Sequence, residues 1–208
     1  MTKLYAGVAV GAVSAFLGAS AYYIWSVQGD DAFAKCRSGQ VAGGDIGGPF
    51  TLVNTDGQQV TDAEVLAKPA LVYFGYTFCP DVCPMDMARN VEAVDILEER
   101  GFDVTPVFIT IDPERDTSEV LAEYAQNLHP KLVALTGSLD QVKAASMAYK
   151  TFFQKQPSED EFYLVDHTTM TYLMLPGTGF ADFYRREVMA DQMAEQVACF
   201  LTATEDVM

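Results

Sequence analysis

Cys79 and Cys83 are the closest pair of cysteines in the sequence that could do chemistry together. They lie in the segment YFGYTFCPDVCPMDM, separated by three residues. An apolar run typical of a buried strand ends at the first cysteine, and an amphipathic pattern typical of a helix follows the second. Because the first turn of a helix presents free N–H groups and the positive end of the helix dipole, we expect this position to stabilise thiolates. The sequence therefore predicts a thiol site at a strand-to-helix junction.

A Cys-x-x-x-Cys pair at such a junction has three interpretations: a structural disulfide, a redox-active dithiol or two thiolate metal ligands. A disulfide that closes so short a loop constrains the unfolded chain little, which disfavours a purely stabilising role. The peroxiredoxin pattern requires Pro seven residues and Thr or Ser three residues before the reactive cysteine, where this chain has Val72 and Tyr76. The thioredoxin motif Cys-x-x-Cys is one residue shorter. Spacing alone leaves the remaining interpretations open.

His167, in the segment YLVDHTTM, is the third candidate. A single histidine at a strand end is more often a hydrogen-bonded structural residue than a ligand. In a domain built from a parallel sheet, however, the loops at the carboxyl ends of the strands gather on one side, which is also where a strand-to-helix junction with the two cysteines would lie. Two thiolates and one imidazole suit Cu(I), or Cu(II) with an added ligand, whereas structural zinc normally takes four protein ligands. The residues therefore favour copper.

A carboxylate is expected to orient the imidazole, because a ligating histidine usually donates its other ring N–H to a carboxylate or carbonyl. Asp166 is adjacent along a strand and should face the opposite side. Asp81 and Asp112 are the better candidates, although Asp112 also precedes a proline and is typical of a turn.

The elements that must position these residues alternate between strands and helices. Two short β-type runs around Asp56-Gly57 predict a hairpin. After it the patterns predict strands at 70–79, 104–111 and 132–137, helices at 84–100, 117–127 and 138–153, a strand pair at 162–167 and 169–176 around His167, and a last helix at 188–201. This order predicts an α/β class, with a thioredoxin-like fold and an added N-terminal β-hairpin.

The amino-terminal segment predicts a single transmembrane helix before this domain. No charged residue occurs from Leu4 to Val27, and at about 1.5 Å per residue that length crosses a hydrocarbon core of about 30 Å. We expect residues 1–28 to form the anchor, residues 29–48 a Gly- and Asp-rich tether, and residues 49–208 the copper-binding domain.

An uncleaved anchor is favoured over a signal peptide. Ala19-Ser20-Ala21 offers a cleavage pattern, but the apolar run continues beyond it. Lys3 before the span predicts a cytoplasmic N-terminus and an exported domain. No Arg- and Ser-rich presequence precedes the span, which favours a single-pass protein of the bacterial inner membrane with a periplasmic domain.

Charge and cysteine content narrow the function classes. The chain has 29 acidic against 13 basic residues and a net charge of −16, which disfavours nucleic acid as a partner because phosphate binding needs clustered Lys and Arg. Four cysteines are too few for a disulfide scaffold. Cys36 in the tether and Cys199 in the last helix are hypothesised to form a structural disulfide, since exported proteins sustain disulfides and domain ends are often close.

Three motifs in order resemble the Sco/SenC family of membrane-anchored copper-binding proteins: CPDVCP, then DPERDT at 112–117, then DHT at 166–168. By this resemblance Cys79, Cys83 and His167 match the family's copper ligands. The resemblance implies copper delivery or thiol reduction during assembly of the binuclear copper site of cytochrome c oxidase. We favour a metallochaperone that delivers copper to this site over an enzyme, and a thiol-disulfide oxidoreductase activity stays open. The resemblance implies as partners the copper-site subunit of the oxidase and other periplasmic copper chaperones or thiol reductases. The alternative is a thiol-disulfide reductase that keeps the target cysteines reduced.

Overall fold

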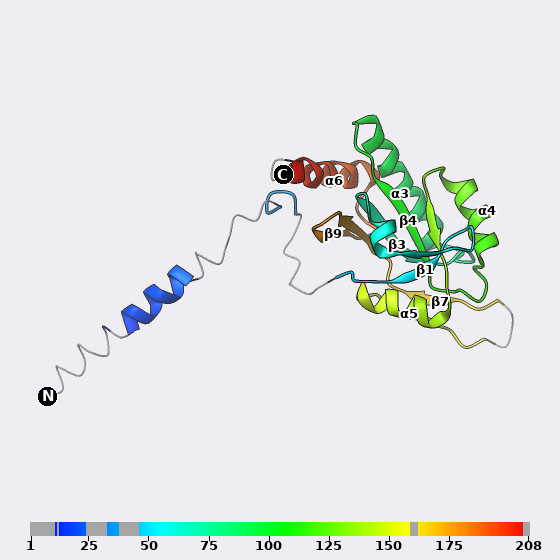
Figure 1. Cartoon of the computed structure of the whole chain (residues 1–208), viewed down its shortest axis with the longest axis horizontal. Coiled ribbons are helices and arrows are strands. Elements are labelled where there is room, and N and C mark those ends of the chain that lie inside the picture. The colour runs from blue at the N-terminus through cyan, green and yellow to red at the C-terminus, as the bar shows by residue number, and fades with distance from the viewer. Residues whose placement is uncertain (1–10, 12, 24–32, 38–45, 159–161, 206–208) are drawn as a thin grey trace.

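The computed structural model describes residues 11, 13–23, 33–37, 46–158 and 162–205 of the chain (Figure 1). Residues 13–23 are helical, and none of the helices in these described ranges is long and apolar enough to cross a membrane. The remainder of the predicted anchor and most of the tether lie outside the described residues. The membrane span therefore stays a prediction.

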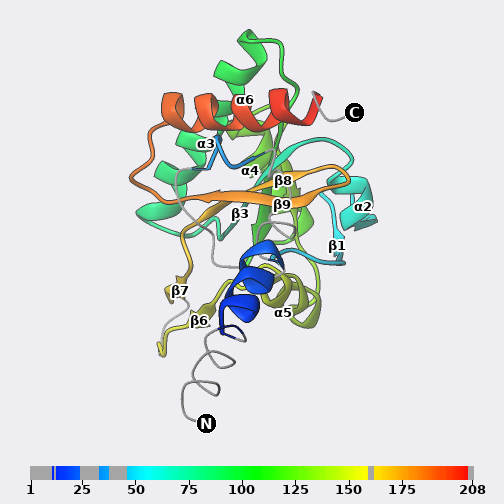
Figure 2. The same cartoon turned by 90° about the vertical axis from the view of Figure 1, so that its left-hand side faces the viewer.

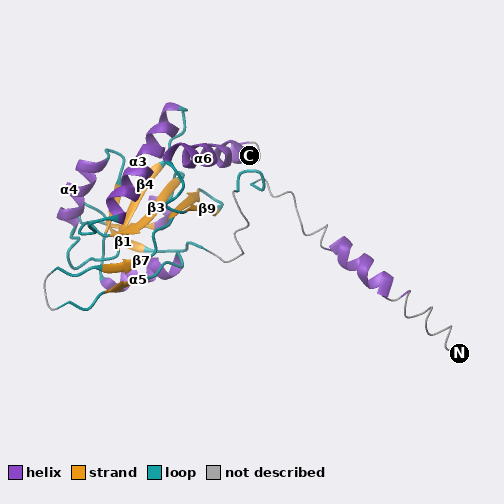
Figure 3. Ribbon diagram, turned by 180° about the vertical axis from the view of Figure 1, so that it is seen from behind, coloured by secondary structure: helices purple, strands orange, loops and turns teal. Residues whose placement is uncertain are grey.

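A five-stranded mixed sheet lies at the centre of the domain (Figure 3). In the order in which they lie side by side, its strands are β5 (Val133–Leu135), β4 (Thr105–Thr110), β3 (Ala70–Gly75), β8 (Thr171–Leu175) and β9 (Gly179–Tyr184). Strands β3, β4 and β5 are parallel, whereas β8 and β9 are antiparallel to their neighbours. Every residue of β3 is buried, which explains why this strand is a continuous apolar run in the sequence.

Helices cover both faces of the sheet (Figure 2). Helices α3 (Val82–Glu99) and α6 (Ala190–Glu205) pack together on one face, α5 (Leu139–Ala148) lies on the other, and α4 (Ser118–Leu128) packs beside β5. Successive residues of β3 point to opposite faces. Leu71 joins the core beneath α3 and α6, whereas Phe74 packs against Tyr149 at the end of α5, with ring centroids 5.2 Å apart.

The predicted N-terminal hairpin is confirmed. Strands β1 (Thr51–Val53) and β2 (Gln59–Thr61) pair antiparallel, and the short helix α2 (Asp62–Val65) follows them. Gly57 has a φ of 74° in the turn, a conformation that glycine adopts without strain. An isolated bridge between Val53 and Thr136 attaches the hairpin to the end of β5.

The predicted pairing around His167 was wrong. Strand β7 (Val165–His167) pairs with β6 (Phe153–Lys155), and β8 pairs with β3 and with β9, which the sequence did not predict. The helix expected at 138–153 ends at Ala148 instead, because Lys150 takes a φ of 55° and leaves the helical conformation. Local patterns identify a strand but carry no information on its partner.

A disulfide joins Cys36 and Cys199 across a sequence separation of 163 residues, with their Cα atoms 5.5 Å apart. The rings of Phe33 and Phe200 pack beside it at a centroid distance of 5.4 Å. The hypothesised pair is therefore linked in the structure, and the link holds residues 33–37 against α6.

Candidate metal centre

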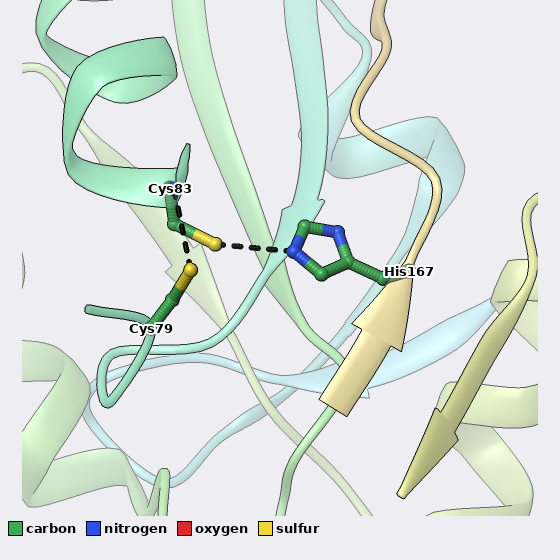
Figure 4. Close-up of side chains that lie close together, drawn as sticks. All are labelled: Cys79, Cys83 and His167. Atoms are coloured by element: carbon green, nitrogen blue, oxygen red, sulfur yellow. Dashed lines mark hydrogen bonds between the residues drawn. The ribbon is translucent and has the colours of Figure 1, made fainter. Parts of the chain in front are cut away.

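The structure brings Cys79, Cys83 and His167 together (Figure 4). Their two sulfur atoms and one ring nitrogen all lie within 4.8 Å of one another, and no other such group of His, Cys, Asp or Glu occurs among the described residues. Cys79 lies in the loop after β3, Cys83 in the first turn of α3, and His167 at the end of β7. The junction between β3 and α3 therefore supplies both sulfurs, and a segment more than 80 residues further along the chain supplies the nitrogen.

Two hydrogen bonds at the start of α3 fix the positions of the two cysteines relative to each other. The backbone N–H of Cys83 donates to the Cys79 sulfur at 3.4 Å, and the N–H of Cys79 donates to the carbonyl of Tyr76 at 3.2 Å. The first bond uses one of the N–H groups that a helix start leaves without a partner. Both sulfurs belong to buried residues, which are 8% and 1% exposed for Cys79 and Cys83.

Burial decides the protonation of Cys83. It raises the pKa of this thiol, as does the side-chain hydrogen bond with Cys79, while backbone and Tyr73 hydrogen bonds act in the opposite direction. The expectation that the helix start would lower the pKa is therefore wrong for Cys83, because desolvation outweighs the helix N–H groups. In the metal-free protein Cys83 is a thiol, and a bound metal ion must replace its proton.

His167 presents an unprotonated nitrogen to the sulfurs. Its Nδ1 lies 3.0 Å from the carbonyl oxygen of Thr168, and because a carbonyl can only accept, Nδ1 carries the hydrogen. Nε2 then carries no hydrogen, and its lone pair accepts a hydrogen bond from the Cys83 thiol, whose sulfur lies 3.4 Å away. Burial lowers the pKa of His167, so the imidazole is neutral at neutral pH, which is the form that binds metals.

Strand pairing and aromatic contacts set the position of His167. In the β6–β7 ladder His167 is opposite Phe153, and the N–H of Thr168 donates to the carbonyl of Phe152 at 3.0 Å. The imidazole meets the rings of Tyr73 and Tyr76 edge-on, at centroid distances of 6.3 and 5.9 Å. The short β6–β7 sheet therefore fixes this donor.

The carboxylates predicted to orient His167 lie elsewhere. Asp81 is the exposed N-cap residue of α3 and its side chain makes no capping bond. Asp112 accepts the hydroxyl of Tyr163 at 2.7 Å and pairs with Arg115. The carbonyl of Thr168 takes the expected place of the carboxylate, because a backbone carbonyl is available at every position and this one lies 3.0 Å from Nδ1.

Asp116 is a supporting residue that sequence reasoning missed, although it lies in the DPERDT motif. It is fully buried and accepts the backbone N–H of Thr77 at 3.0 Å, the hydroxyl of Thr77 at 2.5 Å and the hydroxyl of Thr110 at 2.6 Å. Burial raises its pKa, while the hydrogen bonds from Thr110 and Thr77 act in the opposite direction. Asp116 thereby ties the loop that carries Cys79 to the end of β4.

Comparison with known proteins places this arrangement in a family. Residues 39–202 match the family model described as SCO1/SenC. The chain belongs to the SCO1/SenC family. It is 48% identical over 205 residues to Protein SenC of Rhodobacter capsulatus, covering 98% of this chain and 93% of that protein. Mitochondrial relatives are longer, since the chain spans 46% of SCO1 homolog 1 of Arabidopsis thaliana and 52% of the human SCO1 homolog.

Solved Sco structures share the fold. The crystal structure of Arabidopsis thaliana ScoI with copper bound has a TM-score of 0.70 and 42% identity, over 73% of this chain and 95% of that chain. A second neighbour is the structure of BsSco, which has a TM-score of 0.60 and 26% identity, over 73% of this chain and 91% of that chain. BsSco is described as having a disulfide switch and as a member of the Sco family of cytochrome c oxidase assembly proteins. These neighbours confirm the predicted thioredoxin-like α/β fold.

The three donors of this Sco/SenC chain are close to the spacing that one metal ion requires. Metal–sulfur and metal–nitrogen bonds of about 2.3 and 2.1 Å in a trigonal plane place the donor atoms about 3.8–4.0 Å apart. The Cys83 sulfur and His167 Nε2 are 3.4 Å apart, and no two of the three donor atoms are more than 4.8 Å apart, so the spacing is close to that value. Small side-chain rotations are therefore enough to close the site around an ion.

Proposed function

We propose that this protein is a metallochaperone that binds Cu(I) through Cys79, Cys83 and His167 and delivers it to the binuclear copper site of cytochrome c oxidase. The observation that carries the proposal is the convergence of two sulfurs and one imidazole nitrogen within 4.8 Å, a soft donor set that suits copper. The copper bound in Arabidopsis thaliana ScoI and the oxidase-assembly description of BsSco support it.

The geometry suits cargo that must be released. A three-coordinate ion leaves room for a donor atom of the acceptor protein, so copper can pass by ligand exchange without ever being free. Only thiolates bind the metal. Both cysteines must therefore be reduced, and their thiols must lose their protons when copper binds. The redox state of Cys79 and Cys83 therefore controls whether the protein can carry copper.

Replacement of His167 tests the ligand assignment. We expect His167→Ala in the reduced protein to weaken Cu(I) binding by more than the roughly 100-fold typical of losing a hydrogen-bonding neighbour of a ligand, measured by competition with a chromophoric chelator. The matched control is His129→Ala, because His129 pairs with Asp95 and is not among the three donors. Unchanged Cu(I) affinity in His167→Ala would count against the proposal.

A thiol-disulfide reductase is the second candidate, favoured by the bond from the Cys83 N–H to the Cys79 sulfur at 3.4 Å. This bond would stabilise a Cys79 thiolate, the nucleophile that dithiol exchange needs. Such exchange does not require an imidazole ligand. If His167→Ala reduces a disulfide-containing peptide at the full rate and also supports oxidase assembly, the protein acts as a reductase. If His167→Ala keeps this rate but no longer supports assembly, the result supports copper delivery.

We also propose that residues 1–28 anchor the protein in the bacterial inner membrane, with a cytoplasmic N-terminus and a periplasmic copper domain. The uncharged run from Leu4 to Val27 supports this. The copper-site subunit of the oxidase, other periplasmic copper chaperones and thiol reductases would then be the accessible partners. Externally added protease should digest the domain in spheroplasts; its protection until the membrane is broken would contradict this topology.

A further inference from the structure

Arg115 lies among three aromatic rings that belong to the segments carrying the metal donors. Its Cζ is 3.6 Å from the ring centroid of Tyr163, 4.9 Å from that of Phe78 and 5.6 Å from that of Tyr76. All three distances are within the roughly 6 Å over which a guanidinium is attracted to the face of an aromatic ring. One cation therefore contacts both the loop after β3 and the segment before β7.

Asp112 fixes the guanidinium in this place. Nε of Arg115 donates to Oδ2 of Asp112, and the Tyr163 hydroxyl donates to Oδ1 of the same carboxylate at 2.7 Å. Nη2 of Arg115 is buried, and no described residue accepts a hydrogen bond from it. Because the Arg115 side chain is only 15% exposed, the aromatic rings take the place of water around much of the cation.

Phe78 attaches the cysteine loop to this cation. Phe78 directly precedes Cys79 and is 52% exposed, so apolar burial alone holds its ring weakly. Cys79 lies in a loop, whereas Cys83 lies in the first turn of α3. Asp116, the residue after the cation, holds Thr77 in the same loop. Consecutive residues of the DPERDT motif therefore hold consecutive residues of the loop.

Tyr163 and Tyr76 extend the contact to the other side of the metal centre. Tyr163 lies two residues before β7, the strand that ends at His167. The Tyr76 hydroxyl accepts the backbone N–H of Val165 at 3.3 Å, and the Tyr76 ring meets the His167 imidazole edge-on at a centroid distance of 5.9 Å. Arg115 thus contacts rings on both sides of the metal centre.

We propose that Arg115 is a positioning residue that sets the separation between the Cys79 sulfur and the His167 nitrogen. Its guanidinium joins the loop after β3 to the segment before β7. Without it the Phe78 ring loses its cation, and Cys79 moves with its neighbour. Cys83 keeps its own support in α3. This inference deepens the copper-binding function proposed above, because the separation determines how well the donors fit one ion.

Alkylation of the metal-free full chain, with its free cysteines reduced, tests this positioning without copper. We expect Arg115→Met to accelerate the reaction of Cys79 with iodoacetamide about 5-fold, measured for each cysteine by mass spectrometry, and to leave Cys83 unchanged. Cys83 is the internal control, because global unfolding would expose both cysteines. The matched variant is Lys155→Met, which removes another cation at 3.6 Å from the Tyr163 ring and should leave both rates unchanged.

Copper binding gives a second readout. We expect Arg115→Met to weaken Cu(I) binding about 10-fold in chelator competition. The sulfur-to-copper absorption band of the Cu(II)-loaded protein should also shift, because the bond between Cys79 and copper changes its geometry. Lost stability alone would lower the urea midpoint without moving this band. Arg115→Lys keeps the charge but not the planar group that stacks on the rings, so it should recover only part of the affinity.

Two results would overturn the inference: unchanged alkylation of Cys79 in Arg115→Met, or equal acceleration of Cys79 and Cys83. If Arg115→Met fails to fold, Phe78→Leu removes the same contact at an exposed position and should accelerate Cys79 alone. An unchanged Cys79 rate in Phe78→Leu also overturns the inference. Absence of copper binding in the unsubstituted chain would overturn the proposed function instead, since the alkylation result does not depend on copper.

Discussion

The Cys83 sulfur occupies the space that a side chain at Gly75 would need. A Cβ at position 75 would lie 3.1 Å from the sulfur, and within 2.8 Å of Tyr73 and 3.0 Å of Phe108. Gly75 is the last residue of β3, so the backbone at the end of this strand lies beside the metal centre. A glycine is needed at this position because of the close approach of these side chains. Its backbone dihedral angles are ones that other residues also adopt.

Gly75→Ala is therefore expected to disturb the centre. Overpacking of this kind costs about 1–3 kcal/mol of unfolding free energy, and the displaced Cys83 sulfur should weaken Cu(I) binding. Gly177→Ala is the control, because Gly177 has a φ of 73° but open space around it. That variant adds backbone strain without crowding. Chelator competition should show weaker Cu(I) binding in Gly75→Ala alone; equal affinities would contradict the contact argument.

Removal of the disulfide should lower stability without affecting copper. Cys36 and Cys199 close a loop of 163 residues, and loss of such a link typically costs about 2–5 kcal/mol. We expect the Cys36→Ser, Cys199→Ser double variant to melt at a lower temperature and to bind Cu(I) with unchanged affinity. Calorimetry measures the first and chelator competition the second. A melting temperature equal to that of the parent protein would show that the link contributes nothing.

Asp116→Ala should destabilise the loop that carries Cys79. The substitution leaves the partly buried N–H and hydroxyl groups of Thr77 and the buried hydroxyl of Thr110 without this acceptor, at up to about 1–3 kcal/mol for each unsatisfied group. We expect a loss of at least about 2 kcal/mol in denaturant unfolding. Asp166→Ala is the control, because that carboxylate is exposed. A comparable loss of unfolding free energy in Asp166→Ala would contradict the argument that burial makes Asp116 important.

Acid should destabilise the metal-free protein through His167. Burial lowers the pKa of His167 below its ordinary value of 6.5. As the pH falls through about 6.5, the unfolded chain binds a proton on this imidazole before the folded protein does, so stability is lost toward acid. The loss is at most about 1.4 kcal/mol per pH unit. Urea unfolding at pH 7.5 and 5.5 should show a smaller decrease in His167→Gln; identical decreases would refute a contribution from His167.

Local features of the sequence were sufficient to locate most elements. The apolar run of β3 and the amphipathic pattern of α3 identified the junction between Cys79 and Cys83, because burial on both sides of a strand and on one side of a helix leaves a pattern in neighbouring residues. The order of the motifs identified the family. These inferences needed only short-range information.

Tertiary structure alone decided the rest. The pairing of β7 with β6, the carbonyl of Thr168 as the partner of His167, and the support of the cysteine loop by Asp116 all join residues distant in the chain or depend on how the backbone bends. The pKa of Cys83 shows the physical reason most directly. Its place at a helix start predicts a lower pKa, but the side chains that close over it remove water, and desolvation is a property of the folded whole.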